Sequence, residues 1–416
     1  MRIAVVNWSR RRVGGVETYL GNVIPELIRR GHQLSFWTEV DAPQDRERIV
    51  LPEGVPVWCA EGSGEGIVFP ALRAWRPELL YVHKVMSPRV EERLLEIAPA
   101  IFFAHDYYGT CISGLKTHRS PKVAPCGRRF GPACLLHYYP HRCGGLSPLT
   151  MFKLFRLQSA RLSLLPRYRA IVTHSSHMRE EYLRHGLPFE RVHSLSYYAH
   201  ADVGSSAVAA DWQEVARTEP AKREGFRLLF SGRMDRLKGG EVFISALPEV
   251  RASLGVPLEV TFAGDGPERA RWERKARAVV SGLGDVAVRF VGWLDKHELD
   301  QLYAEADLLV FPSLWPEPFG LTGLEAGRHG LPVAAFPVGG VKDWLTDGVN
   351  GHLAEGTSLD AHALAGAVVK CLRDREAYAR LRRGALATTN KFTLDVHLRA
   401  LVNVFARVLD ETGGEV

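Results

Sequence analysis

The chain has 416 residues, of which 46% are apolar and 24% are charged, and its formal net charge is +6. This composition is ordinary for a globular enzyme, and the length exceeds one ordinary core, so we expect two domains of roughly 200 residues each. The mild basic excess suits a nucleotide sugar or an anionic membrane surface. It does not favour nucleic-acid binding, because no basic run exceeds Arg10-Arg11-Arg12 and no aromatic–basic repeat accompanies it.

Membrane-spanning and exported proteins are also disfavoured by the sequence. No run of about 18 apolar residues occurs, as a transmembrane helix would require. The apolar stretch that begins at Ile3 is too short for a signal peptide and instead predicts a strand. We therefore expect a cytoplasmic protein, at most peripheral to the inner face of the membrane.

In the first half, apolar runs alternate with helical patterns. Strands are predicted at residues 3–6, 33–38, 79–82, 100–103 and 170–173. A loop with Gly14 and Gly15 leads from the first strand into a helix that ends near Arg30. Strands that alternate with helices predict an α/β fold, with parallel sheets covered by helices on both faces.

The same alternation of apolar runs and helical patterns begins again in the second half. Strands are predicted at residues 226–230, 258–263, 286–290, 307–311 and 332–335. Residues 198–224 lack a strong strand pattern and read as a linker, whereas residues 393–409 carry apolar side chains at helical spacing. We expect domains at 1–205 and 206–392, and a C-terminal helix at 393–416 that crosses back to the first domain.

The most informative segment lies where a buried strand passes through a loop into a helix. It contains two glutamates eight positions apart, in Glu317-Pro318-Phe319-Gly320-Leu321-Thr322-Gly323-Leu324-Glu325. Both carboxylates then lie at the carboxyl edge of a parallel sheet, where open α/β folds bind ligands. The backbone N–H groups of residues 319–322 would open the helix and can face a phosphate.

Three further motifs precede this segment. They are Gly232-Arg233 with Lys238-Gly239, the turn Gly264-Asp265-Gly266-Pro267, and the strand end Gly292-Trp293. In this order the four motifs resemble family 4 retaining glycosyltransferases, which have the GT-B fold of two facing Rossmann-like domains. The resemblance covers nearly the whole second half and is looser in the first, at Gly14-Gly15, His105-Asp106 and Ser175-Ser176.

The resemblance implies a retaining, metal-independent transfer of a hexosyl-type sugar from a UDP- or GDP-sugar to an acceptor hydroxyl. Such a reaction would serve the synthesis of a bacterial glycan, glycolipid or natural-product glycoside. Domain closure on the donor would assemble the site. The departing phosphate would take the acceptor's proton, so the two glutamates are not the acid and base of a glycosidase.

The resemblance also assigns roles to residues. Arg233 and Lys238 would stabilise the charge of the departing diphosphate, Glu317 would hold the sugar, and His105 would lie near the acceptor hydroxyl. The remaining donor contacts would come from Gly14, Gly15, Gly292, Trp293, Phe319, Gly320, Leu321, Thr322 and Glu325. More ordinary interpretations of these residues are surface ion pairs, a glycine turn and helix N-terminal acids favoured by the macrodipole.

A cysteine-rich insert near residues 111–145 stands apart from these motifs. Its cysteines are Cys111, Cys126, Cys134 and Cys143. They could bind a structural zinc, with His137 or His141 as substitute ligands, although intervals of 15, 8 and 9 residues match no zinc knuckle. Structural thiols and a disulfide are the alternatives, and no cofactor is expected for catalysis.

Residues 151–169 form a basic, amphipathic stretch. It would either lie on an anionic membrane or pack on the first domain with a solvated basic face. The competing functions for the whole chain are a non-catalytic sugar-nucleotide-binding subunit and another GT-B enzyme, an epimerase or a phosphorylase. The sugar, the base, the acceptor and the oligomeric state are not fixed by the sequence.

Overall fold

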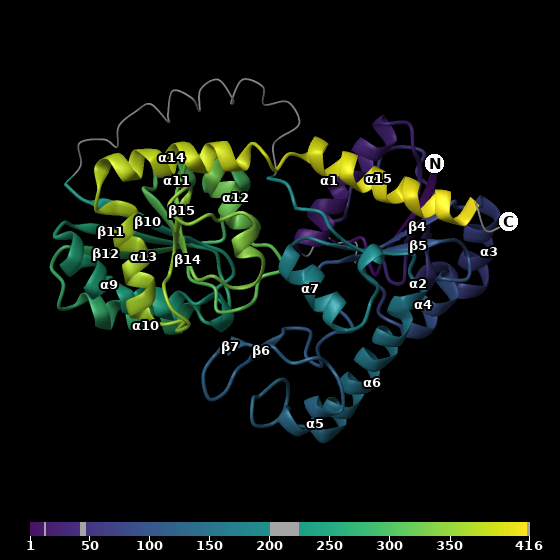
Figure 1. Ribbon diagram of the computed structural model, residues 1–416, viewed down its shortest axis with the longest axis horizontal. Helices are drawn as coiled ribbons and strands as arrows, with labels where there is room; N and C mark the ends of the chain where they lie inside the picture. The colour runs from purple at the N-terminus through teal and green to yellow at the C-terminus, as the bar shows by residue number, and fades with distance from the viewer. Residues whose placement is uncertain (12–13, 42–46, 200–223, 414–416) are drawn as a thin grey trace. The chain divides into compact units, whose positions relative to one another are not determined.

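The computed structural model describes residues 1–11, 14–41, 47–199 and 224–413 (Figure 1). The chain divides into two compact units. Unit 1 contains Met1–Lys116, Gly127–Ser196 and Leu394–Val416, and unit 2 contains Thr117–Cys126 and Tyr197–Thr393. Most of the predicted linker lies outside the described residues.

Unit 1 is built on a seven-stranded parallel sheet in the order β3-β2-β1-β4-β5-β8-β9. Its strands are β1 (Arg2–Asn7), β2 (Gln33–Thr38), β3 (Val57–Cys59), β4 (Leu79–Val82), β5 (Ala100–Ala104), β8 (Ala170–Thr173) and β9 (Val192–Ser194). The strand order reverses beside β1, which creates the kind of switch point where open sheets bind ligands.

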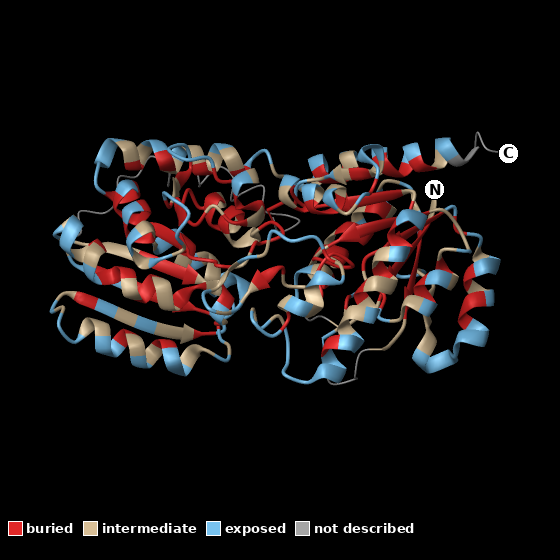
Figure 2. Cartoon of the chain, turned by 60° about the horizontal axis from the view of Figure 1, so that its bottom comes forward, coloured by how far each residue is buried: buried red, intermediate tan, exposed pale blue. Residues whose placement is uncertain are grey.

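The helices of unit 1 include those that cover its sheet and those of the insert. They are α1 (Gly15–Arg29), α2 (Ala60–Ser63), α3 (Glu65–Trp75), α4 (Pro88–Leu94), α5 (Ala133–His137), α6 (Pro148–Leu164), α7 (Ser176–Arg184) and α15 (Leu394–Gly413), with 3-10 turns η1 (Leu165–Arg167) and η2 (Phe189–Arg191). The inner strands β1, β2, β4, β5 and β8 are almost wholly buried, because aliphatic and aromatic side chains meet helices on both faces (Figure 2).

Unit 2 contains a six-stranded parallel sheet in the order β12-β11-β10-β13-β14-β15. Its strands are β10 (Phe226–Ser231), β11 (Leu258–Ala263), β12 (Val286–Gly292), β13 (Leu308–Phe311), β14 (Val333–Ala335) and β15 (Gly351–Leu353). Its helices are α9 (Gly240–Leu254), α10 (Arg269–Val280), α11 (Lys296–Glu305), α12 (Leu321–Arg328), α13 (Ala361–Leu372) and α14 (Arg375–Thr389), with turns η3 (Arg236–Lys238) and η4 (Gly339–Asp343).

The structure confirms the predicted fold class, and the predicted strands agree with the observed ones to within two residues. The short strands β3, β9 and β15 were not predicted, because each has only three residues and no clear alternation. A small hairpin of β6 (Thr117–His118) and β7 (Ala124–Pro125) was also missed. It lies inside the predicted cysteine-rich insert, yet residues 117–126 group with unit 2.

The C-terminal helix α15 belongs to unit 1. Its buried His397 accepts a hydrogen bond at Nε2 from the hydroxyl of Tyr19 on α1, over 2.8 Å, and donates from Nδ1 to the carbonyl of Ser196. None of the described helices has the length and apolar content that crossing a lipid bilayer requires.

Candidate functional site

The carboxyl edge of the sheet in unit 2 brings Lys238 and Glu317 together. Lys238 Nζ lies 2.6 Å from Glu317 Oε1, although the two residues are 79 positions apart. The hydroxyl of Ser313 donates to the same carboxylate oxygen over 2.7 Å. The Glu317 side chain is 5% exposed and that of Lys238 is 29% exposed. The pair therefore presents its cationic half to solvent.

Local backbone geometry explains why these two loops meet. Asp235 caps the turn η3 by accepting from the N–H of Leu237, and Leu314 N–H donates to the carbonyl of Leu237 over 2.8 Å. The turn ends at Gly239, whose φ is +72°. A Cβ there would lie 1.8 Å from the carbonyl oxygen of Pro312, so only glycine allows this approach.

Arg233 lies in the same loop after β10 but is exposed. The predicted glycine turn after β11 packs closely against this loop. A Cβ at Gly264 would lie 2.1 Å from the carbonyl oxygen of Gly232, and one at Gly266 would lie 2.4 Å from that of Met234. This turn therefore supports the loop that carries Arg233, a packing role that the sequence did not predict.

Glu325 lies eight residues after Glu317 in the sequence, on α12. It is partly buried, and burial raises the pKa of its carboxyl group. The hydroxyl oxygen of Tyr303 lies 3.5 Å from Glu325 Oε2 and 3.3 Å from Ser231 Oγ. Glu325 therefore lies near the end of β10, at the same sheet edge as the Lys238–Glu317 pair.

The start of α12 is fixed by Trp344. Its indole N–H donates to the carbonyl of Phe319 over 2.7 Å. Gly320, with φ +95°, precedes the first residues of the helix, Leu321 and Thr322. A Cβ at Gly323 would lie 2.0 Å from the Trp344 ring, so the first turn packs directly on the indole.

Gly292 is the last residue of the edge strand β12, and Trp293 follows it. Gly292 has a φ of +81° and accepts a 2.7 Å hydrogen bond from the N–H of Gly264. The Trp293 side chain is 82% exposed. The structure thus leaves a large aromatic surface at this edge, where the sequence predicts a base contact.

The carboxyl edge of the sheet in unit 1 carries a row of three histidines. His83, His105 and His174 follow the adjacent strands β4, β5 and β8. His83 Nδ1 lies 2.7 Å from His105 Nε2, and His105 Nδ1 lies 2.9 Å from His174 Nε2. Only His105 was predicted. The position of each histidine just after a predicted parallel strand is the signal that could have revealed the other two.

Burial keeps this histidine row neutral. It lowers the pKa of His105 to about 3, with Lys84 and His397 as smaller causes, and it lowers the pKa values of His83 and His174 well below the usual range. A neutral imidazole has a single N–H. His105 therefore donates to one neighbour and accepts from the other, so both of its ring nitrogens are already engaged.

The first βα loop shows no packing requirement for its glycines. A Cβ built at Gly14 or Gly15 would meet no atom within 4 Å. Gly14 has an extended backbone with φ −172°, which any residue can adopt, and its N–H donates to Glu17 over 3.0 Å. Nothing within the described protein therefore explains why glycine occupies these positions.

The structure does not assemble the four insert cysteines into a metal site. Among the described residues, no group of three or more His, Cys, Asp or Glu side chains has the geometry to hold a metal ion. None of the cysteines, all of which are described, forms a disulfide. Cys111 instead accepts from the N–H of Lys116, and Cys134 and Cys143 pack against a small apolar cluster. The possible zinc site at these cysteines therefore stays a prediction, to be tested by the metal content of the purified protein.

A cavity of about 860 Å³ in unit 2 is a feature that the sequence did not predict. Basic side chains from four segments line it, namely Lys122, Arg236, Lys275 and Lys342. None of the predicted donor residues contributes to its wall. We therefore place the candidate site at the Lys238–Glu317 pair and not at this cavity.

Comparison with known proteins identifies the family. Residues 13–196 match the family described as Glycosyltransferase Family 4, and residues 225–374 match the one described as Glycosyl transferases group 1. Together these matches cover most of both units. The chain belongs to the family 4 glycosyltransferases.

The similarity to curated relatives extends over only part of this chain. A D-inositol 3-phosphate glycosyltransferase of Xylanimonas cellulosilytica is 32% identical over 244 residues, which are 57% of each chain. A glycogen synthase of Mycobacterium tuberculosis is 35% identical over 210 residues, 48% of this chain and 45% of the relative. The chain thus spans about half the length of the curated relatives it matches.

Solved structures of other proteins share the fold over the whole chain. Anabaena HepE in complex with UDP has a TM-score of 0.65 and 18% identity, covering 98% of this chain and 100% of that one. Sucrose-phosphate synthase from Thermosynechococcus elongatus has a TM-score of 0.62 and 19% identity, covering 99% of both chains. These likenesses confirm the GT-B fold.

Proposed function

We propose that this protein is a retaining glycosyltransferase that moves a sugar from a UDP- or GDP-sugar to an acceptor hydroxyl without a divalent metal. The observation that carries the proposal is the Lys238–Glu317 contact of 2.6 Å, with Ser313 on the same carboxylate. Membership of family 4 supports it, as does the related fold of HepE, which was crystallised with UDP.

In this proposal, unit 2 binds the donor. A departing nucleoside diphosphate develops negative charge on its β-phosphate. The exposed Arg233 guanidinium and the Lys238 ammonium would stabilise that charge, a task that a metal ion performs in other enzymes. Glu317 would accept hydrogen bonds from hydroxyls of the donor sugar, and Glu325 from the ribose.

Unit 1 would bind the acceptor with neutral groups. A base with a pKa of about 3, as His105 has, is a weak proton acceptor near pH 7, and both its ring nitrogens are already hydrogen-bonded. We therefore assign the acceptor's proton to the departing phosphate. His105 would serve to shape the acceptor site.

The direct test is an assay of nucleoside diphosphate release with a panel of UDP-, GDP-, ADP- and dTDP-sugars, with and without acceptor alcohols. Slow donor hydrolysis is expected without acceptor, and the transferred sugar should keep its anomeric configuration by NMR. Donor binding without any release would instead indicate a non-catalytic subunit. Inversion, epimerisation or phosphate-dependent cleavage would contradict the proposal.

The Glu317→Gln variant tests the role of the carboxylate. It should lower kcat much more than it weakens donor binding, because the charge matters most when the glycosidic bond breaks. Equal losses in kcat and in donor affinity would make Glu317 a ground-state binding group. The expected cytoplasmic location stays a prediction.

A further inference from the structure

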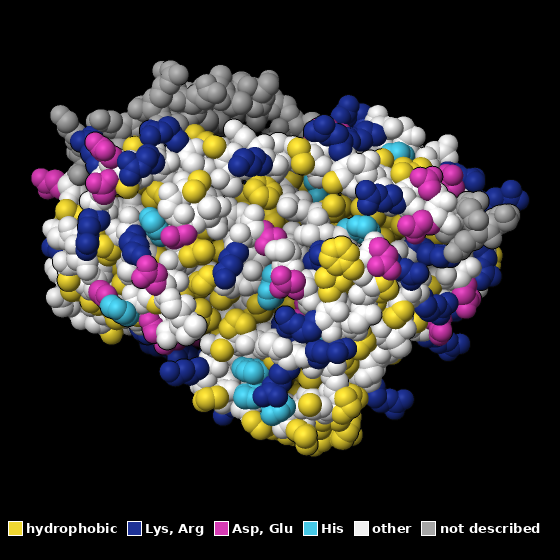
Figure 3. Space-filling model, viewed as in Figure 1, with side chains coloured by type: hydrophobic (Ala, Val, Ile, Leu, Met, Phe, Trp, Pro, Cys, Tyr) yellow, Lys and Arg dark blue, Asp and Glu magenta, His cyan; other side chains and the backbone are white. Residues whose placement is uncertain are grey.

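The end of the cysteine-rich insert presents an apolar surface to solvent. Large apolar side chains stand exposed at five positions within 17 residues of sequence. We call this set the apolar tip, and it consists of Leu136 (78% exposed), Tyr139 (38%), Leu146 (83%), Leu149 (82%) and Phe152 (51%). Figure 3 shows apolar side chains gathered at the α5 end of α6, with cationic and histidine side chains beside them. Such a patch marks an interaction surface.

The apolar tip is part of a folded element and not a loose loop. Behind it, Ile112, Phe130, Tyr138 and Met151 form a buried cluster. The loop after α5 closes over this cluster, since a Cβ at Gly144 would lie 2.1 Å from the Tyr138 hydroxyl. The interior is therefore already filled, and the exposed leucines have no place inside it.

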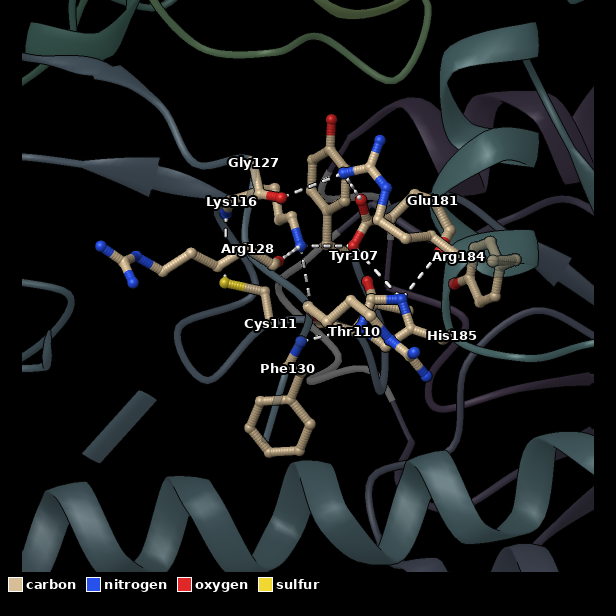
Figure 4. Close-up of polar contacts among 12 residues, drawn as sticks. Tyr107, Thr110, Cys111, Lys116, Gly127, Arg128, Phe130, Glu181, Arg184 and His185 are labelled. Atoms are coloured by element: carbon tan, nitrogen blue, oxygen red, sulfur yellow. Dashed lines mark hydrogen bonds and ion pairs between the residues drawn. The ribbon is translucent and has the colours of Figure 1, made fainter. Parts of the chain in front are cut away.

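A buried polar network fixes the root of the insert to α7 (Figure 4). The Lys116 ammonium pairs with the Glu181 carboxylate, and their side chains are 4% and 2% exposed. Lys116 also donates to the carbonyl of Arg128, while His185 Nε2 accepts from the N–H of Phe130 over 2.9 Å. Arg184 donates to the carbonyl of Gly127 over 3.2 Å. The insert is thus held firmly to unit 1.

The charge of this region is one-sided. Residues 107–179 contain twelve Lys and Arg and no Asp or Glu, whereas the whole chain carries only +6, so the remaining residues carry −6. Exposed members of this set lie close to the apolar tip in sequence, namely Arg128, Arg129, Arg142, Lys153 and Arg156. The apolar tip therefore lies within a strongly cationic segment.

We propose that the apolar tip docks on the surface of an anionic lipid bilayer. Leucine and phenylalanine side chains would enter the boundary between headgroups and acyl chains, and the surrounding cations would lie against anionic headgroups. A second copy of this chain fits the surface less well, because self-association through it would bring two cationic segments together. An anionic bilayer offers both headgroups of opposite charge and acyl chains that accept apolar side chains.

This surface differs from the stretch at residues 151–169 that the sequence singled out. Met151, Arg161 and Leu164 of that stretch are buried on unit 1. The helix α6 is therefore largely a packed element, and only its first turns reach the apolar tip. The docking surface is formed by α5, the loop after it and the start of α6.

Vesicle co-sedimentation of the full chain tests the proposal. The wild-type protein should bind vesicles of phosphatidylcholine mixed with phosphatidylglycerol at least about tenfold more tightly than vesicles of phosphatidylcholine alone, and added salt should weaken the binding. The double variant Leu146→Asp, Leu149→Asp should lose about tenfold or more of this binding, because it places two carboxylates at the lipid surface.

The control is Ile67→Asp, which changes an apolar side chain that is 64% exposed on α3 of the same unit. It should bind vesicles like the wild type, and all variants should keep the wild-type Tm because the altered positions are exposed. Equal vesicle binding by the double variant and the wild type would overturn the proposal. The proposal would also be overturned if the wild-type protein did not bind anionic vesicles but formed oligomers that the double variant does not form.

This test is independent of the proposed reaction. Donor hydrolysis without vesicles should be the same in the double variant and the wild type. Failure of hydrolysis in both proteins would contradict the proposed function while vesicle binding still decides the docking proposal.

Discussion

The two sheet edges of this protein are built from opposite chemistry. The edge in unit 2 has a charged pair, Lys238 and Glu317, with an exposed arginine in the loop beside it. The edge in unit 1 has a row of neutral imidazoles, in which each ring is hydrogen-bonded to the next. In the proposed reaction the first edge would stabilise the charge that develops, whereas the second would offer hydrogen bonds and shape. The two edges should therefore respond differently to substitution and to pH.

The largest expected effect is on the rate, at the charged edge. Arg233→Ala should lower turnover on the order of a hundredfold, equivalent to about 3 kcal/mol, because a cation near the departing phosphate is lost. Tm should not change, since Arg233 is exposed. The matched control is Arg236→Ala, which removes an exposed arginine three residues away. Similar losses in both variants would reduce the role of Arg233 to general surface charge.

The next effect is on stability, at His397 of α15, whose ring packs beside Phe103 of β5 in unit 1. Burial lowers the pKa of His397 from 6.5 to about 4, so the unfolded chain binds a proton that the folded chain does not. The stability that this group contributes is present above pH 6.5 and is lost as the pH falls through the window down to about 4. At pH 5 the loss is about 2 kcal/mol for this group alone.

Thermal unfolding at pH 7 and pH 5 measures this effect. The Tm of the wild type should be lower at pH 5 than at pH 7. The decrease should be smaller in His397→Gln, because glutamine cannot be protonated at this position. His362→Gln, at a histidine whose side chain is 87% exposed, is the control and should behave like the wild type. A His397→Gln variant with the full wild-type pH dependence would show that this histidine is not buried in its neutral form.

A smaller effect is expected at Gly15 in unit 1, where the family resemblance implies a further contact with the donor. Gly15→Ala should raise the donor KM several-fold while Tm stays equal or rises, because a Cβ there meets only open space and alanine favours a helix by up to about 1 kcal/mol. Gly21→Ala, also in open space on α1, should raise stability alone. An unchanged KM in Gly15→Ala would mean that the glycine serves only the turn.

The smallest effect is expected in the insert, away from both edges. Cys126→Ser and Cys143→Ser should each cost at most about 1 kcal/mol of stability, since these partly buried thiols do not converge on a metal. Elemental analysis of the purified protein should find no stoichiometric zinc. One zinc per chain, lost in either variant, would restore the metal site.

The fold could be predicted from the sequence because its signals are local. Apolar runs such as residues 33–38 and 258–263 read as buried strands, and the structure places β2 and β11 at those residues. The spacing of Glu317 and Glu325 predicted their place at one sheet edge for the same reason, since both lie between β13 and β14, Glu317 in the loop and Glu325 on α12.

What could not be predicted depends on contacts between distant segments. Lys238 meets Glu317 across 79 residues, and Lys116 meets Glu181 across 65. The row of His83, His105 and His174 depends on the order of the strands, which the sequence alone did not provide. The grouping of residues 117–126 with unit 2 and the filled cluster behind the cysteines likewise depend on packing.

The central claim is that protein cations, and not a metal ion, stabilise the departing diphosphate. Turnover of the preferred sugar nucleotide should be measured after treatment with a chelator, with and without added magnesium or manganese. Equal rates are expected in all three conditions. Activity that disappears with the chelator and returns only with the metal would contradict it.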